Sequence, residues 1–229
     1  YGLTFVTQTS KLLALNPGWV IETIWDTSMS SGGRYIYISM TIKQFSNRKT
    51  RIVKSSDYGA TWQDITDSVP EFNFPLRLDN TIVVSGSGEY VVLRIKPNLT
   101  TGGNYISSNY GQTWSLTSDQ SVNNTNDTDL LSNESGQYVI YQRQSQGGSL
   151  YLSSDYGNTF SILSTTHVDF IRDLTISNSG QFISYTSKAS TSPGVYSLFL
   201  SENYGSSFSI TNYSSLQDQP INPTIYVDV

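Results

Sequence analysis

Apolar and polar residues change places along this chain in short runs that are typical of β-strands. Runs such as Tyr35–Met40, Tyr90–Ile95 and Tyr138–Tyr141 each follow a cluster of small polar residues and glycine. No stretch has the length or the 3.6-residue period of a helix, and the apolar run Leu12–Leu15 is too short to count. The pattern therefore predicts an all-β protein.

One eight-residue pattern, S-x-D-x-G-x-T-W, stands between consecutive runs and predicts a hairpin turn. Its full copies are Ser55–Trp62, Ser107–Trp114, Ser153–Phe160 and Ser201–Phe208, and the chain opens with a truncated copy, Tyr1–Phe5. The Asp or Asn can accept backbone hydrogen bonds, the glycine can take a positive φ, and the Thr or Ser hydroxyl can close the loop. The predicted structural residues are Asp57, Gly59, Thr61, Trp62, Asn109, Gly111, Thr113, Trp114, Asp155, Gly157, Thr159, Phe160, Asn203, Gly205, Ser207 and Phe208.

A second turn recurs about midway between these copies, where a glycine precedes an aromatic residue. Its copies are Ser31–Tyr35, Ser87–Tyr90, Ser135–Tyr138 and Ser179–Phe182. The tyrosines of the first pattern are spaced 46 to 57 residues apart, and a period of about 40–50 residues with four short strands indicates propeller blades. We expect one domain with four complete blades at about 19–67, 76–118, 127–165 and 170–213, and with partial blades at both ends.

The strand order within a blade follows from these two turns. The inner strands are predicted at Ile21–Ser28, Thr81–Ser85, Asp129–Ser132 and Leu174–Ser177. After the second strand a variable loop follows, which is Lys43–Lys49 in the first blade, and this loop leads to the third strand. Such loops and the links between blades meet on one face around the axis, where a ligand site is expected. The end segments Thr4–Thr9 and Pro223–Val229 are predicted as strands of incomplete blades in an ordered fragment of a longer chain.

The eight-residue pattern resembles the Asp-box, or BNR, repeat. That repeat occurs in sialidases, other glycoside hydrolases, sortilin-type receptors and photosystem assembly factors, where it joins the third and fourth strands of a propeller blade. The variant here is similar to repeats of algal and large DNA virus proteins. Asn109 and Asn203 replace the aspartate in two copies, so hydrogen bonding is favoured over metal binding as the role of this position.

The charge and composition of the chain limit the kinds of molecule that it is expected to bind. The net charge is −5, which argues against nucleic acid and anionic membranes as partners. Charged residues make up 14% of the chain, against about 25% in ordinary domains. Polar uncharged residues replace them, which suits an extracellular, cell-surface or virion-surface protein that binds other subunits or surface glycans. The chain has no cysteine and no apolar run long enough for membrane insertion, and we expect no metal and no cofactor.

Candidate chemistry is sparse. His167 is the single histidine, and no nucleophile–base pattern accompanies it. Charged residues near the predicted inner strands could form a site on the axial face: Asp26, Asp79, Asp129, Asp173, Arg77 and Arg172. They could bind calcium or act as an acid/base pair for glycoside hydrolysis, although hydrogen bonding within turns and strand starts is the stronger interpretation. Asp127 lies near the same strands.

The resemblance to sialidases can be tested residue by residue. Those enzymes carry an arginine triad, a Tyr–Glu pair, an acid Asp and a Phe/Tyr-Arg-Ile-Pro stretch. The nearest match here, Phe170–Asp173, has another order and lacks the proline. The sialidase catalytic set is therefore not visible, and release of a sialoside by the purified protein would contradict this prediction.

The predicted function is a non-catalytic structural or recognition module. A glycoside hydrolase of the sialidase or xyloglucanase type is the alternative, and a chaperone like the photosystem assembly factors is a further one. Candidate glycosylation sequons stand at Asn98, Asn123, Asn126, Asn133 and Asn212. About as many sequons are expected by chance in a chain so rich in Asn, Ser and Thr. They therefore allow N-glycosylation but do not predict it.

Overall fold

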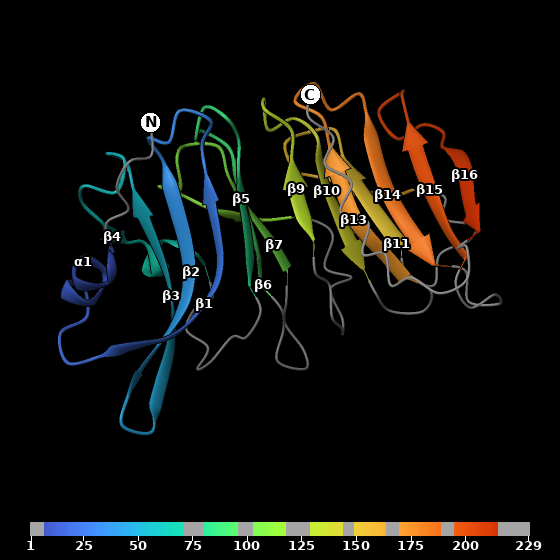
Figure 1. Cartoon of the computed structure of the whole chain (residues 1–229). Helices are drawn as coiled ribbons and strands as arrows, with labels where there is room; N and C mark the ends of the chain where they lie inside the picture. The colour runs from blue at the N-terminus through green and yellow to red at the C-terminus, as the bar shows by residue number, and fades with distance from the viewer. Residues whose placement is uncertain are drawn as a thin grey trace. The chain divides into compact units, whose positions relative to one another are not determined.

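The computed structural model describes residues 7–70, 80–95, 103–117, 129–143, 149–163, 170–188 and 195–214. Four antiparallel sheets of four strands each account for most of these residues, and we call each sheet a blade (Figure 1). The chain divides into two compact units, Tyr1–Asn123 and Asn124–Val229. Each unit contains two blades and is described by itself.

The first unit contains blades 1 and 2. Blade 1 consists of β1 (Val20–Met29), β2 (Ile36–Gln44), β3 (Asn47–Ser55) and β4 (Gln63–Asp64). Blade 2 consists of β5 (Thr81–Val84), β6 (Val91–Ile95), β7 (Gly103–Ser107) and β8 (Ser115–Leu116). Strands pair in sequence order, as the two alternating turns predict. All five residues of β6 are buried, because this strand is covered on both faces, which its continuous apolar run favours.

The second unit repeats this plan. Blade 3 consists of β9 (Leu130–Ser132), β10 (Val139–Arg143), β11 (Ser149–Ser153) and β12 (Ser161–Ile162). Blade 4 consists of β13 (Phe170–Ile176), β14 (Ile183–Lys188), β15 (Val195–Ser201) and β16 (Ser209–Ser214). The pairing of β13 with β14 shifts register between Arg172 and Thr175. This bulge bends the inner strand of blade 4 at the place where Asp173 stands.

The cores lie between neighbouring blades. In the first unit one cluster joins the two blades and contains Tyr37, Ile52, Ile65, Val69, Ile82, Val84, Val91, Leu93, Ile95, Tyr105 and Trp114. In the second unit the corresponding cluster contains Ile140, Leu150, Leu152, Ile171, Leu174, Ile183, Tyr185 and Phe199. Burial of these side chains supplies the main stabilisation, because hydrogen bonding within a single blade leaves both faces exposed.

Two predictions about the start of the chain are wrong. Thr9–Ala14 forms a short helix, α1, in a segment where no helix is expected from the period. Its Leu12 is buried against the face of blade 1 that Ile38, Met40 and Val53 present. Packing therefore decides the conformation of a run too short to be stable alone. Thr9, predicted as part of a strand, opens this helix, and residues 4–6 of that strand lie outside the described residues, as does Pro223–Val229.

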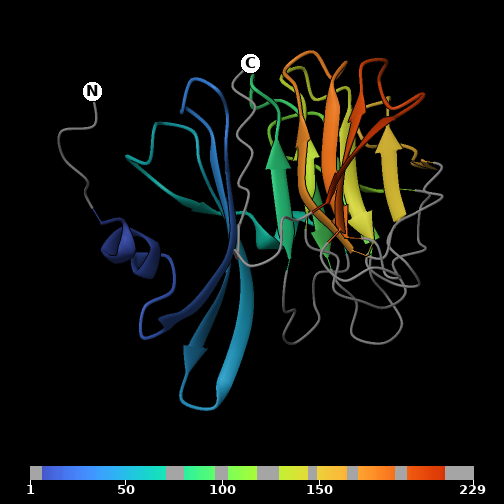
Figure 2. The same cartoon turned by 45° about the vertical axis from the view of Figure 1, so that its right-hand side comes forward.

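The variable loop Lys43–Lys49 is also different from the prediction. β2 continues to Gln44 and β3 starts at Asn47, so the two strands form a long hairpin with Phe45 and Ser46 at its tip. Figure 2 shows this hairpin extending well past the other strands of the blade. A short 3-10 helix, η1 (Thr66–Ser68), follows β4.

No helix in the described part of the chain is long and apolar enough to cross a membrane.

Candidate functional site

The eight-residue pattern forms the same turn in all four blades. In blade 1 the Ala60 N–H donates to the Asp57 carbonyl at 3.0 Å, and Tyr58 and Gly59 between them have φ of +59° and +79°. Positive φ at both central residues defines a type I′ turn, whose twist matches that of the flanking strands. The equivalent tyrosines, Tyr110, Tyr156 and Tyr204, have φ of +59°, +63° and +57°. We call this the repeated turn; the positive φ of its tyrosine is not evident from the sequence.

Side chains close the repeated turn from within, as the sequence predicts. In blade 1 Asp57 Oδ1 accepts from the Thr61 N–H at 2.8 Å, and Asp57 Oδ2 accepts from the Thr61 hydroxyl at 2.6 Å. The first serine contributes as well, because Ser55 Oγ accepts from the Gly59 N–H at 2.8 Å. The same bonds close the turn around Asp155. Every carboxylate oxygen of the turn therefore has a partner within the turn.

Where asparagine replaces aspartate, the turn is closed by the same two bonds, but the side-chain amide donates to the hydroxyl instead of accepting from it. Asn109 Oδ1 accepts from the Thr113 N–H at 3.0 Å, as an aspartate would, but Asn109 Nδ2 donates to Thr113 Oγ1 at 2.8 Å. Asn203 and Ser207 form the same two bonds. A hydroxyl can donate or accept, which explains why both residue types occur at this position.

The hydrogen bonds lower the pKa of the aspartates in these turns. The Thr61 hydroxyl, the Thr61 N–H and the Ser55 hydroxyl together lower the pKa of Asp57 to about 2. Burial acts to raise the pKa of Asp155, but the bonds from Thr159 and Ser153 outweigh it, so that the pKa is lowered overall. Both groups are carboxylates at neutral pH and act as acceptors.

The repeated turn is also joined to the glycine–aromatic turn of its own blade, which we call the corner. The N–H of Tyr58 donates to the Arg34 carbonyl at 3.2 Å, and the N–H of Tyr110 donates to the Glu89 carbonyl at 3.0 Å. Blades 3 and 4 have the equivalent bonds. Each corner is closed by a polar side chain before it; for example, Ser30 Oγ accepts from the Tyr35 N–H at 3.0 Å.

Neighbouring blades meet through the aromatic residue of the corner. The Tyr35 ring of blade 1 lies between Gly88 and Tyr110 of blade 2, with its centroid 4.8 Å from that of Tyr110. In the second unit Tyr138 of blade 3 lies in the same way between Gly180 and Tyr204 of blade 4, at 5.0 Å from the Tyr204 centroid. We call the space between a blade's corner glycine and its turn tyrosine the aromatic slot.

The inner-strand acid of blade 1 has a structural role. Asp26 Oδ2 accepts from the Ile82 N–H of blade 2 at 2.9 Å, and Asp26 Oδ1 accepts from the Thr27 N–H at 2.7 Å. Burial raises the pKa of Asp26. This carboxylate therefore joins two blades and has little capacity left for a ligand.

In the second unit Asp129 and Asp173 lie near enough for the charge of one to act on the other. Burial raises the pKa of Asp129, and the negative charge of Asp173 raises it further. The Gln142 N–H donates to the Asp129 carbonyl at 3.1 Å, so Asp129 stands opposite Gln142 and on the same face of blade 3. Gln142 Nε2 then donates to the Ile171 carbonyl of blade 4 at 3.1 Å, two residues before Asp173.

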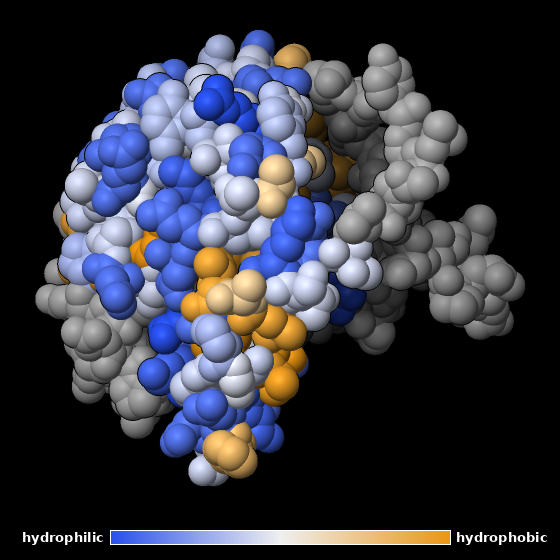
Figure 3. Space-filling view, turned by 90° about the vertical axis from the view of Figure 1, so that its left-hand side faces the viewer, coloured by the Kyte–Doolittle hydropathy of each residue, from blue (hydrophilic) through white to orange (hydrophobic). Residues whose placement is uncertain are grey.

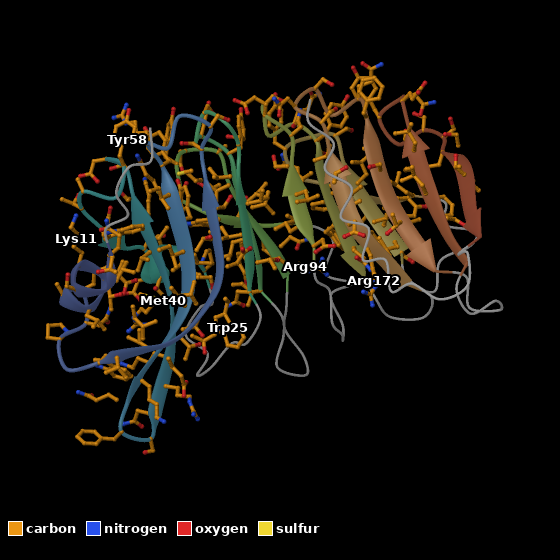
Figure 4. The ribbon with its side chains drawn as sticks, in the orientation of Figure 1. Lys11, Trp25, Met40, Tyr58, Arg94 and Arg172 are labelled. Atoms are coloured by element: carbon orange, nitrogen blue, oxygen red, sulfur yellow. The ribbon has the colours of Figure 1, made fainter. Side chains whose placement is uncertain are left out.

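Asp173 is held in an unusual conformation. Its φ is +52° within the bulge of β13, and its Oδ2 accepts from the Thr186 hydroxyl at 3.1 Å. A positive φ at a residue other than glycine costs free energy, and such residues concentrate at functional positions. Arg172 beside it is exposed, near the lower ends of the strands in Figure 4. Asp129, Asp173 and Arg172 form the acid pair and its arginine, the best candidate site among the described residues.

The other candidates divide into two groups. Arg77, Asp79, Asp127 and His167 lie outside the described residues, as do the sequons at Asn98, Asn123 and Asn126. Asn133 is buried, its Oδ1 accepts from the Tyr138 N–H at 2.9 Å, and its Nδ2 donates to the Asn178 carbonyl at 3.2 Å. This amide closes a corner, so a glycan on it is incompatible with the folded blade. Asn212 lies in β16. No group of three or more acidic, histidine or cysteine side chains that could hold a metal occurs in the described ranges.

Two buried polar residues were not expected from the sequence. Gln142 and Arg94 are both almost fully buried, and both stand four residues after a corner aromatic, in strands β10 and β6. The four-residue spacing from the corner aromatic can be found in the sequence. Only the structure shows that Gln142, at this position, faces the neighbouring blade. Figure 4 shows Arg94 near the lower ends of the strands of blade 2.

Comparison with known proteins bears on the fold alone. No protein-family model matches the chain, and no curated protein matches its sequence. Solved structures of β-propeller proteins do match. One is the GH74 enzyme of Niastella koreensis, with a TM-score of 0.59 and 17% identity over 89% of this chain and 31% of that one.

Two more solved structures agree with this result. The GH74 xyloglucanase of Xanthomonas campestris has a TM-score of 0.55 and 10% identity, over 82% of this chain and 38% of that one. TolB of Acinetobacter baumannii has a TM-score of 0.54 and 13% identity, over 83% of this chain and 43% of that one. The fold is a β-propeller. The chain spans about a third of the length of the GH74 structures, and at such identities the similarity carries no activity.

Proposed function

We propose that this chain is a non-catalytic recognition module of the Asp-box propeller type, in an extracellular, cell-surface or virion assembly, and that it binds a surface glycan. The repeated turns match the Asp-box pattern in residues, in position between the third and fourth strands, and in closure by the Asp or Asn side chain. The low charge content and the net charge of −5 favour a neutral, hydroxyl-rich ligand over a polyanion.

The observation that carries this proposal is the acid pair and its arginine. The turn carboxylates and Asp26 are occupied by hydrogen bonds within the fold. Asp129 of blade 3 and Asp173 of blade 4 instead lie near enough for the charge of Asp173 to raise the pKa of Asp129, and exposed Arg172 precedes Asp173 in the chain. Carboxylate oxygens accept from sugar hydroxyls, and guanidinium N–H groups donate to them. Such a set positions a sugar without requiring any reaction.

Binding to immobilised glycans tests the proposal. We expect the purified chain to bind a subset of neutral glycans on an array, and we expect Arg172→Ala and Asp173→Asn each to weaken that binding at least about tenfold. The matched control is Asp57→Asn, which changes an aspartate in a repeated turn and should leave binding unchanged. Equal binding by Asp173→Asn and the unchanged chain, or no binding to any glycan, would overturn the proposal.

A second candidate is glycoside hydrolysis, which one observation favours. Glycosidases pair a carboxyl group of raised pKa, the general acid, with a second carboxylate. Asp129 has a raised pKa and Asp173 is its charged neighbour. Incubation with xyloglucan and measurement of new reducing ends separates the two functions. Hydrolysis that is lost in Asp129→Asn would establish the enzyme, whereas binding without hydrolysis supports the recognition module. The chaperone alternative is disfavoured by the net charge of −5, since it requires a basic surface.

A further inference from the structure

The hairpin of β2 and β3 is longer than the described pairing of the second and third strands in any other blade. Its strands form nine residue pairs, the last of which joins Gln44 to Asn47. The corresponding strands form five described pairs in blades 2 and 3 and six in blade 4. Strand β1 accompanies the hairpin as far as the pair of Val20 with Lys43. Three strands therefore support a tip that extends beyond the rest of the blade (Figure 2).

Side chains on the flanks of the hairpin fix its orientation. Arg48 Nε and Nη2 donate to the two carboxylate oxygens of Glu22 on β1, at 2.6 and 2.7 Å. Lys43 Nζ lies 3.8 Å from the same carboxylate, and Lys49 Nζ lies 5.0 Å from the centroid of the Trp19 ring. Exposed ion pairs contribute little free energy, but a guanidinium bound to both oxygens of a carboxylate has one geometry. The hairpin thus presents its tip in a defined direction.

The residue at the tip is one that folding does not favour there. Phe45 and Ser46 form the two-residue loop, and of the two only Phe45 has a positive φ, at +55°. This is the pattern of a type II′ turn, in which glycine is preferred at the first position. Phe45 is also 88% exposed, so its ring gains almost no burial. A strained backbone and an exposed ring both oppose phenylalanine at this place.

The other strained residues are explained by contacts within the fold. The tyrosines of the repeated turns have positive φ, and their N–H groups donate to the corner carbonyls of the same blade. Asp173 has positive φ and accepts from the Thr186 hydroxyl. Phe45 belongs to neither set. Because strained residues concentrate at sites where the strain serves function, the ring of Phe45 is best explained by a contact outside the chain.

The hairpin is basic on a chain that is acidic. Its segment Lys43–Lys54 holds five of the 13 lysines and arginines and no acidic residue, so the rest of the chain has eight basic and 18 acidic residues. Lys43 and Arg48 are a cross-strand pair directly behind the pair that closes the loop. Their side chains are 39% and 44% exposed. Positive charge therefore flanks the exposed ring, and it attracts an acidic partner.

The chemistry of the tip favours a protein over a lipid surface or a neutral glycan. Figure 3 shows this side of the molecule with the hairpin at its lower end, where most residues are hydrophilic, and the larger hydrophobic patch lies higher up. One ring among Gln44, Ser46 and Asn47 is too little apolar surface to hold a protein on a membrane. A neutral glycan makes no use of the basic flanks. Aromatic residues and arginine are, in contrast, enriched in protein interfaces.

We propose that the tip of the β2–β3 hairpin is a docking site for a partner protein whose surface is acidic around a small apolar pocket, and that Phe45 enters this pocket. Lys43 and Arg48 meet the acidic rim from the two strands behind the ring. Because one hairpin offers a small contact area, the complex should be weak and transient, with a Kd of about 1 μM or weaker. This site is independent of the glycan site proposed for the second unit.

Selection from a display library tests the site. The probe is a phage-displayed library of small folded domains with one randomised surface, selected on the immobilised full chain. Most independent binders should have an acidic randomised surface, and Phe45→Gly should weaken their binding at least about tenfold. The matched control is Ile162→Thr, which changes an apolar residue that is 60% exposed in β12 and should leave binding unchanged.

Stability measurements separate recognition from folding. Glycine adopts a positive φ without strain, so Phe45→Gly should melt at the same temperature as the unchanged chain or higher. Lys43→Gln combined with Lys49→Gln should slow association about tenfold, as should high salt, because the charges steer the partner. A lower melting temperature for Phe45→Gly would show a structural role for the ring and would overturn the proposal.

Two further results would contradict the docking site. One is a set of binders that Phe45→Gly and Ile162→Thr affect equally. The other is sedimentation of the chain with phosphatidylserine vesicles that Phe45→Gly abolishes, since the tip would then recognise lipid. Phe45→Gly should bind glycans as the unchanged chain does, and Arg172→Ala should retain the selected binders. Failure of one proposal is therefore distinguishable from failure of the other.

Discussion

The ring of Tyr35 lies so close to Gly88 that a Cβ atom on this glycine would stand 2.6 Å from Tyr35 Cγ. The contact joins the corner of blade 1 to the corner of blade 2, and Tyr138 and Gly180 repeat it between blades 3 and 4. Since the overlap involves the base of the ring, the tyrosine cannot avoid a new methyl group by rotating its far end. The corner glycine is thus required for packing between blades as well as for its positive φ.

Alanine at two corner glycines separates these effects. Gly88 and Gly33 have φ of +85° and +75°, so the backbone strain of an alanine, about 1 kcal/mol, is common to both. Only Gly88→Ala also overlaps a ring, which should cost a further 1–3 kcal/mol or so. We expect a clearly larger loss of unfolding free energy for Gly88→Ala in denaturant titrations at low protein concentration. Equal losses would show that Tyr35 leaves the slot at no cost.

The repeated turn should tolerate a change of charge but not a change of backbone. Gly157 has a φ of +84°, and Gly157→Val places a β-branched residue there, which should destabilise by about 2 kcal/mol or more. Asp155→Asn should be mild, because Asn109 and Asn203 close the same turn by donating to the hydroxyl. Thermal melts of both variants measure the difference. If Asp155→Asn proved as harmful as the glycine change, the charge itself would matter and a bound metal would have to be reconsidered.

The low pKa of Asp57 makes a specific contribution at acid pH. Its folded-state pKa of about 2 lies below the unfolded value near 4. A lowered folded pKa means that the contribution is complete above about pH 4 and is lost as the pH falls through about 2. We therefore expect the melting temperature of Asp57→Asn to approach that of the unchanged chain as the pH is lowered from 5 towards about 2. A constant difference over this range would contradict the assignment.

The turns could be predicted from sequence because all their interacting groups lie within eight residues. In blade 1 the bonds of the turn join only Ser55, Asp57, Gly59 and Thr61. The turn therefore needs nothing from the rest of the fold except the two strands that it connects. The period of these turns then determined the number and order of strands. Helix α1 could not be predicted in this way, because it depends on Leu12 packing against blade 1 and on Lys11 bonding to the Gly59 carbonyl.

The candidate site was predictable only in part, for the same reason. Six charged residues near the inner strands were equivalent candidates in the sequence. Asp26 differs from Asp129 because the Ile82 N–H lies within reach of its carboxylate. The charge of Asp173 acts on Asp129 at a place where β13 has a bulge after Arg172 and where Gln142 joins blade 3 to the Ile171 carbonyl. These contacts join residues far apart in the chain, and no local pattern encodes them.

Ionisation of Asp129 beside Asp173 should lower the stability of the folded state as the pH rises. Burial and the charge of Asp173 raise the folded-state pKa of Asp129 above its unfolded value. For a raised pKa, the stability associated with the protonated group is fully present below the unfolded pKa, near 4, and is lost as the pH rises through the folded pKa. Asp129→Asn removes the group that must ionise, so this variant should melt at a higher temperature than the unchanged chain at pH 7.

A double-mutant cycle shows whether Asp173 is the cause. Asp173→Asn should also raise the melting temperature at pH 7, because asparagine tolerates a positive φ and can still accept from the Thr186 hydroxyl. The double variant should then gain less than the sum of the two single gains, since each change removes the same repulsion. Additive gains would show that the two carboxylates do not interact. A lower melting temperature for Asp129→Asn would show that this carboxylate has a favourable partner and that repulsion from Asp173 does not dominate.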